Sequence, residues 1–83
     1  MLFYNEPKTL ADAKLNETVT VRDLTAEGDV RRRFLDLGIV CGAAVKPLFK
    51  SPFGDPVAYE IHSTVIALRL CDCKTILIEK MNK

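Results

Sequence analysis

One segment of this 83-residue chain carries a helical period, and it limits the possible folds more than any other feature. Val30, Phe34 and Leu37 lie at i, i+4 and i+7, so they form one apolar stripe along a short helix. Asp29 stands where an N-cap is expected, and Gly38 stands where a chain leaves a helix with a positive φ. Because no other segment shows this period, a helical bundle and a βαβ unit are both excluded. We expect the three apolar side chains to plug the core of a fold built from strands.

The rest of the chain favours short strands joined by tight turns. Pro47 removes a ladder donor, so its strand is expected to form an edge or to carry a bulge at that point. Residues 51–56 hold two prolines and one glycine, which predicts the turn of a hairpin. The predicted strands are residues 17–25, 43–50, 57–62, 65–68 and 75–79.

These segments predict a mainly β fold class, a small β-barrel of about five strands with one short α-helix after the first strand. The length corresponds to one domain over residues 1–83, with a core at about residues 9–79. Thr9 to Ala13 fits a single helical turn with Thr9 as its N-cap. Residues 1–7 show no period, so they either pack as an N-terminal arm or do not belong to the folded core.

Charge and cysteine content narrow the functional class. Twelve basic and eleven acidic residues leave a formal net charge of +1, whereas a general nucleic-acid binder has a strongly basic face. The three cysteines cannot all pair and no signal peptide is recognisable, so we expect reduced thiols in the cytoplasm. No run of about 18 apolar residues exists, so we expect no insertion into a membrane. Any role in a membrane process would require docking to a partner.

The sequence contains no arrangement that supports catalysis. It has no Ser–His–Asp order in a suitable context, no paired carboxylates around a cleft and no glycine-rich phosphate loop. Gly54-Asp55-Pro56 has the chemistry of a turn rather than that of a phosphate site. We therefore expect a non-enzymatic protein with no catalytic residue and no cofactor.

Cys71-Asp72-Cys73 is the motif closest to a metal site, and Cys41 or His62 could add a third ligand for a divalent transition metal. In an extended segment the two thiols would face the same side, whereas in a helical turn they would diverge by roughly 200°. We expect the turn, with one cysteine packed inward as a small apolar residue. His62 is a lone histidine on a hairpin, which is more often hydrogen-bonded than metal-bound. The sequence therefore assigns no metal ligand.

Two segments are candidates for contact with a partner protein. Arg31, Arg32 and Arg33 form either a solvated face, with Arg32 or Arg33 paired to Asp36, or an electrostatic patch that docks to an acidic surface. Phe53 lies among prolines at the predicted hairpin tip, where it either anchors a partner or folds back over the barrel mouth. The candidate partner-binding residues are thus Arg31, Arg32 and Phe53.

The order of these motifs resembles the FeoA family. In that family an arginine-containing helix ends in Asp-Leu-Gly, a second glycine follows, a Gly-Asp-Pro turn comes next, and an Ala-Leu-Arg segment precedes the last strand. Three positions depart from the pattern, namely Cys41 in place of a common proline, His62-Ser63 in place of a glycine, and Cys73 in place of an alanine. The matching segments are Phe34 to Ile39, Gly42, Pro52 to Pro56, Val65 to Arg69 and Ile76 to Glu79.

This resemblance implies an SH3-like barrel and a role that composition does not reveal. FeoA proteins act with FeoB, a membrane transporter of ferrous iron with a cytoplasmic GTPase domain. The implied function is a non-enzymatic accessory or regulatory protein that docks to that domain. The alternatives are a metal-sensing domain with cysteine or histidine ligands, and nucleic-acid binding, which the charge disfavours. The edge near Pro47 leaves the oligomeric state open, because an edge can pair with another chain but proline hinders this.

Overall fold

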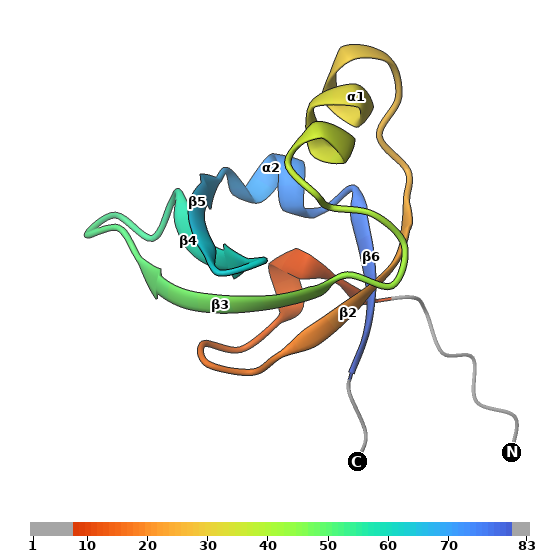
Figure 1. Cartoon of the computed structure of the whole chain (residues 1–83). Helices are drawn as coiled ribbons and strands as arrows, with labels where there is room; N and C mark the ends of the chain where they lie inside the picture. Colours follow the sequence, from red (N-terminus) through yellow and green to blue (C-terminus); the bar gives the residue numbers. More distant parts are fainter. Residues whose placement is uncertain (1–7, 81–83) are drawn as a thin grey trace, which may run out of the picture.

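The structure is a computed structural model that describes residues 8–80. Residues 1–7, for which the sequence allowed either a packed N-terminal arm or a segment outside the core, lie outside the described residues. Strands are the main regular structure, and two short helices and one 3₁₀ turn lie between them (Figure 1). In chain order the elements are β1 (Lys8–Thr9), η1 (Leu10–Asp12), β2 (Val19–Leu24), α1 (Gly28–Asp36), β3 (Ala44–Lys50), β4 (Val57–Ile61), β5 (Thr64–Leu68), α2 (Leu70–Cys73) and β6 (Ile76–Lys80).

The strands form one antiparallel sheet with the order β1-β6-β2-β3-β4-β5. The sheet bends around its own inner face, and both helices lie on one side of it (Figure 1). The outermost strands β1 and β5 do not pair, so the sheet is not closed. The mainly β class and the helix after the first long strand are confirmed. The sixth strand is the two-residue β1, whose backbone leads directly into η1 with Thr9 at the N-cap position, as predicted.

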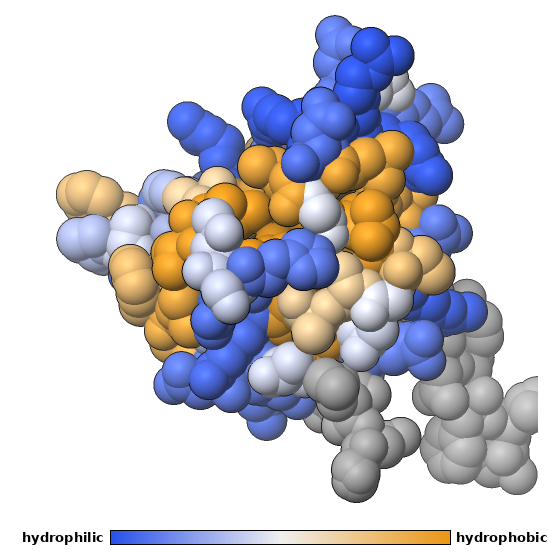
Figure 2. All heavy atoms as spheres, in the orientation of Figure 1, coloured by the Kyte–Doolittle hydropathy of each residue, from blue (hydrophilic) through white to orange (hydrophobic). Residues whose placement is uncertain are grey.

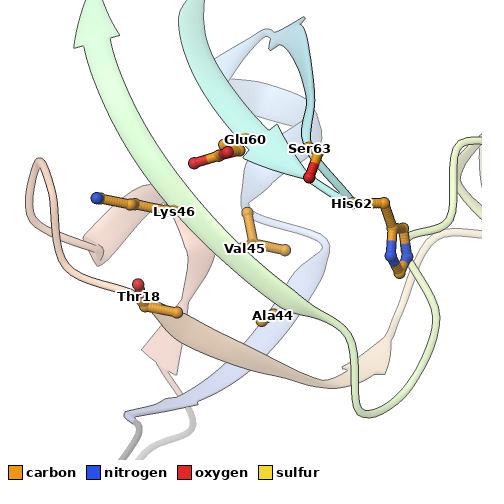
Figure 3. A pocket seen from close by; sticks show the side chains of 7 residues that line it. All are labelled: Thr18, Ala44, Val45, Lys46, Glu60, His62 and Ser63. Atoms are coloured by element: carbon orange, nitrogen blue, oxygen red, sulfur yellow. The ribbon is translucent and has the colours of Figure 1, made fainter.

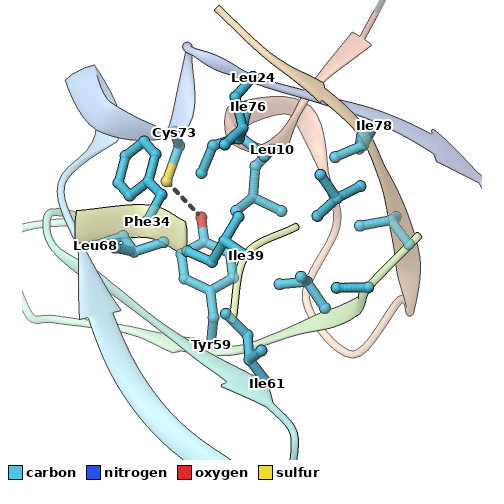
Figure 4. Packing of buried hydrophobic residues seen from close by; sticks show 14 of the residues in the cluster. Leu10, Leu24, Phe34, Ile39, Tyr59, Ile61, Leu68, Cys73, Ile76 and Ile78 are labelled. Carbon is cyan, nitrogen blue, oxygen red and sulfur yellow. Dashed lines mark hydrogen bonds between the residues drawn. The ribbon is translucent and has the colours of Figure 1, made fainter. Parts of the chain in front are cut away.

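The core fills the inner face of the bent sheet (Figure 4). Alternation along β4 places Val57, Tyr59 and Ile61 inward, as the period-2 pattern predicts. Phe34 from α1 and Leu10 from η1 are fully buried among them. One continuous apolar cluster therefore joins the sheet to both α1 and η1.

The predicted irregularity at Pro47 is confirmed. β3 pairs with β2 only through Ala44 and Val45, and with β4 along its length, with a register shift between Pro47 and Phe49. Beyond Val45, β3 no longer pairs with β2. The missing N–H of Pro47 therefore breaks no hydrogen bond on that side. The carbonyl of Pro47 instead accepts a hydrogen bond from the N–H of Asn16 at 2.7 Å.

Helix α1 differs from the prediction at its start and along its face. It begins at Gly28, which has a φ of +65°, so the N-cap is Glu27 and Asp29 lies in the first turn. The predicted Asp29 cap is therefore wrong, although its charge still lies near the positive end of the helix dipole. The three-residue stripe does not plug the core, because Phe34 is fully buried while Val30 and Leu37 are 38% and 39% exposed. In Figure 1 the helix lies at the top of the molecule, above α2 and away from the sheet.

The end of α1 docks onto the turn between β4 and β5. Gly38 has a φ of +93°, as predicted for the residue that leaves the helix. The turn consists of His62 and Ser63, which both have positive φ values, a two-residue hairpin geometry that favours glycine or asparagine. The Nε2 atom of His62 lies 3.3 Å from the carbonyl oxygen of Gly38. A Cβ atom at position 38 would lie 2.6 Å from Cδ2 of His62, so a larger residue there would displace the His62 ring.

We predict that Gly38→Ala destabilises the fold more than Gly42→Ala. Gly42 is a matched control, because its φ is +94° and a Cβ there meets nothing within 4 Å. Each substitution introduces backbone strain of about 1–2 kcal/mol, and the alanine at position 38 also displaces the His62 ring. Urea unfolding measures both free energies. In a His62→Ala background the two substitutions should lower the free energy of unfolding equally. Equal losses with His62 present would contradict the role of its ring.

Candidate functional site

Four partly exposed apolar side chains lie on α1 and the loop that follows it. Val30, Leu35, Leu37 and Val40 are each 38–42% exposed, and we call these four residues the α1 patch. Figure 2 shows hydrophobic surface directly beside strongly hydrophilic side chains at the top of the molecule, where α1 lies. Exposed apolar side chains beside polar ones are a feature of many protein–protein contacts.

The three arginines of α1 have different partners. Arg31 donates from Nη1 to the carbonyl oxygen of Leu24 at 3.0 Å, which ties the helix to the end of β2. Arg33 pairs with Asp72 of α2, with Nη2 and Oδ2 3.5 Å apart. The side chain of Arg32 has no hydrogen bond or ion pair with any described residue and is exposed. Arg32 is therefore the arginine that the described part of the fold leaves available.

The predicted ion pairs between Asp36 and Arg32 or Arg33 are wrong. A partner from α2 replaces the neighbour within the helix, because the fold brings Asp72 within reach of Arg33. This contact is mostly solvent-exposed on the arginine side, so it adds at most about 1 kcal/mol. It links α1 to α2.

Phe53 projects from the hairpin between β3 and β4. Its side chain is 95% exposed, so it does not fold back over the sheet. The loop beneath it is braced by two backbone hydrogen bonds, from Gly54 N–H to the Ser51 carbonyl and from Ser51 N–H to the Pro56 carbonyl. Figure 1 places this hairpin tip and α1 at different corners of the molecule. The two predicted partner-binding segments therefore do not form one continuous site.

Asp55 has a role that the sequence did not reveal. Its carboxylate accepts a hydrogen bond from the N–H of Leu70, the first residue of α2, at 2.9 Å. This contact joins the β3–β4 turn to a helix 15 residues further along the chain. The Gly-Asp-Pro segment predicts only a turn, because nothing local indicates a distant N–H partner.

The cysteines lie as the helical alternative predicts. Cys71 is exposed and Cys73 is buried on the short helix α2, so the two thiols point in different directions. Cys73 donates from Sγ to the hydroxyl oxygen of Tyr59 at 3.2 Å inside the core (Figure 4). The thiol of Cys41 donates to the carbonyl oxygen of Arg22 at 3.0 Å. Among the described residues, no three His, Cys, Asp or Glu side chains are grouped so that they could hold a metal ion.

A shallow open hollow of about 190 Å³ lies beside the β4–β5 turn. Figure 3 shows that Lys46 and Glu60 line it from the neighbouring strands β3 and β4, with His62 and Ser63 at one end. Pockets that hold organic ligands usually measure 300–1,000 Å³ and enclose most of the ligand. This hollow therefore gives no reason to assign a cofactor or substrate.

The contact between Cys73 and Tyr59 predicts a loss of stability at alkaline pH. Burial raises the pKa of the Cys73 thiol from 9.0 to about 11, and it also raises the pKa of the Tyr59 hydroxyl. Above pH 9 the unfolded chain releases the Cys73 proton while the folded chain keeps it, so the free energy of unfolding falls as pH rises toward about 11. The expected loss is on the order of 2 kcal/mol.

Urea unfolding between pH 8 and pH 11 measures this loss. A Cys73→Ala variant should be less stable at pH 8 but should lose less stability between pH 9 and pH 10 than the unchanged protein. Equal slopes for the two proteins would contradict the assignment to Cys73.

Comparison with known proteins assigns this chain to a family. A family model described as FeoA domain matches residues 8–80. No curated protein matches the chain significantly. None of the helices in the described part of the chain has the length and apolar character needed to cross a membrane.

Three solved structures show the extent of the likeness. The FeoA protein from Chlorobium tepidum is 31% identical with a TM-score of 0.85, and the match covers 90% of this chain and 71% of that chain. A FeoA-like protein from Clostridium acetobutylicum is 30% identical with a TM-score of 0.84, over 96% and 93% of the two chains. FeoA from Stenotrophomonas maltophilia, an SH3 domain protein solved in complex with zinc, is 28% identical with a TM-score of 0.77, over 87% and 89%. These matches confirm the predicted SH3-like fold, and the chain belongs to the FeoA family.

Proposed function

We propose that this protein is a non-enzymatic accessory factor of ferrous iron uptake that acts as a single-domain module in the cytoplasm. In this proposal it docks to the cytoplasmic, GTPase-containing part of a FeoB-type membrane transporter. The FeoA protein of Stenotrophomonas maltophilia is described as a candidate activating factor of ferrous iron transport, which supports the role in uptake. The observation that carries the docking proposal is the α1 patch.

The α1 patch has the composition of an interaction surface. Four partly exposed aliphatic side chains offer apolar area, and Arg32 adds a positive charge that no residue in the described part of the chain pairs. Interfaces concentrate their energy in a few apolar or arginine anchors, and nearby charges steer the approach of an oppositely charged partner. We therefore expect the partner surface to be apolar with an acidic rim.

Phe53 provides a second proposed contact. An aromatic side chain that is 95% exposed loses its hydration at little conformational cost when a partner covers it. The two hydrogen bonds beneath the loop hold the tip in place, so less ordering is needed on binding. A partner that reaches both α1 and the hairpin tip would have to span two corners of the molecule. Arg31 lies next to Arg32 on α1 and is kept as a proposed contact, although its guanidinium already donates a hydrogen bond to the carbonyl oxygen of Leu24.

The proposal predicts measurable binding to the purified cytoplasmic domain of the FeoB-type transporter from the same organism. Titration calorimetry in the nucleotide-free, GDP-bound and GTP-analogue-bound states would detect it. Leu37→Ala and Phe53→Ala should each weaken the affinity about tenfold, because each truncates an apolar anchor. Arg32→Ala should mainly slow association and reduce its dependence on salt.

Matched controls separate these effects from damage to the fold. Phe49→Ala removes another exposed phenylalanine, 59% exposed on β3, and should leave the affinity unchanged. Lys74→Ala removes an exposed charge next to α2 and should not alter the association rate. Absence of binding in all three nucleotide states would refute docking, and equal losses in the control variants would refute the assigned surface.

The metal-sensing alternative gains no support from the described residues, because Cys71 and Cys73 diverge on α2. The same titration separates the two functions. Cys71→Ser should leave transporter binding unchanged with and without Fe²⁺ under anaerobic conditions. A loss of binding that appears only with Fe²⁺ would favour a thiolate metal site instead.

A further inference from the structure

Strand β5 (Thr64–Leu68) is an edge without the usual protection. It is the last strand of the sheet order, so no described strand pairs with its outer side. Its five residues contain no charge and no proline, although natural edge strands commonly carry one or the other. It is fully extended and pairs with β4 at every position without a bulge. These properties make β5 a template for another strand.

The turn before β5 determines which backbone groups face outward. His62 and Ser63 form a two-residue turn, so Ile61 and Thr64 are the pair that closes the hairpin. Residues along an antiparallel strand alternate between directing their N–H and C=O groups toward the partner and away from it. Counting from Thr64, the residues that direct these groups away from β4 are Val65 and Ala67. Four backbone groups therefore face outward with no partner among the described residues.

The side chains of β5 are incompletely covered on both faces of the sheet. Val65 is 57% exposed and Ala67 is exposed on the outer face, while Ile66 is only partly buried on the core face. The outer face continues an apolar row, because Ala67 pairs with Ala58 and Ala58 pairs with Phe49. Another strand beside β5 would extend this row and cover the exposed side of Ile66.

We propose that a second copy of this chain pairs with β5 in antiparallel orientation, about a two-fold axis through Ile66. In this register Val65 of each copy lies opposite Ala67 of the other, and the outward N–H and C=O groups of both residues are satisfied. Ile66 meets its symmetry mate in the close, non-hydrogen-bonded pair. The apolar row then continues from Phe49 through Ala58 and Ala67 to Val65 of the second copy.

The lack of charge on β5 allows a second copy of the same edge to pair with it in this register. Arg69, which follows β5 along the chain, lies opposite Ser63 of the second copy, and Glu60 lies on β4 beside Val65, so no like charges face each other in the new strand pair. A register shifted to centre on Ala67 would place Arg69 against Val65 and leave Thr64 without a partner residue in the strand. The edge is thus complementary to itself, with apolar side chains opposite apolar side chains at every central pair.

Sedimentation of the full chain over a range of concentrations up to millimolar tests the proposal. The expected result is a reversible monomer–dimer equilibrium. Val65→Pro removes an outward N–H from each copy without touching the bonds to β4, so it should weaken the dimer at least tenfold. Should this variant fold poorly by circular dichroism, Val65→Lys places a charge on the edge and should give the same loss. Phe49→Lys is the matched control, since it lies on the same outer face two strands away and should keep the dimer.

Disulfide trapping tests the register. In a background with Cys41→Ser and Cys71→Ser, Ile66→Cys should crosslink two copies under mild oxidation, because opposite residues of a non-hydrogen-bonded pair lie about 4.5 Å apart at Cα. Thr64→Cys is more exposed but lies about four residues from its symmetry mate, so it should not crosslink. A protein that stays monomeric, a dimer that Val65→Pro does not weaken, or crosslinking at position 64 rather than 66 would each overturn the proposal. Uptake of a strand from a different protein at β5, without self-association, would overturn it as well.

Discussion

The close approach of Gly38 to the β4–β5 turn is the contact on which the rest of the arrangement depends. A helix of nine residues is too short to be stable alone, so α1 must be held by tertiary contacts. Gly38 allows the chain to turn back at a φ of +93° and brings its carbonyl oxygen to 3.3 Å from His62. Directly after it, Ile39 enters the core as a fully buried side chain. The helix end and the β4–β5 hairpin are therefore positioned by each other.

This mode of attachment explains why α1 exposes so much apolar surface. The helix is held by Phe34 in the core, by Arg31 on the carbonyl of Leu24 and by Arg33 on Asp72. None of these contacts covers Val30 or Leu37, because the helix lies at the top of the molecule, away from the sheet (Figure 1). A helix that lay flat on the sheet would bury its stripe and leave little for a partner. The same geometry thus supports the fold and leaves the α1 patch available.

The motifs that identify the family serve mainly to position other elements. Asp55 of the Gly-Asp-Pro turn binds the first N–H of α2, so the β3–β4 hairpin holds the helix that carries Asp72. Cys73 on the same helix bonds to Tyr59 of β4 in the core. Through these contacts the hairpin holds α2, and α2 in turn holds α1. The surfaces proposed for binding lie around this framework rather than within it.

The sequence by itself determined the local elements, because period, glycine and proline act over a few residues. It located α1, the hairpin turn at residues 51–56, the irregularity at Pro47 and a helical turn with one inward cysteine, whereas the structure identified that cysteine as Cys73. Only the tertiary structure decided which apolar residues are buried, that Asp72 rather than Asp36 pairs with Arg33, and that β5 is the unprotected edge. Each of these depends on how elements distant in the chain lie against one another, and a helical or strand period carries no information on that placement.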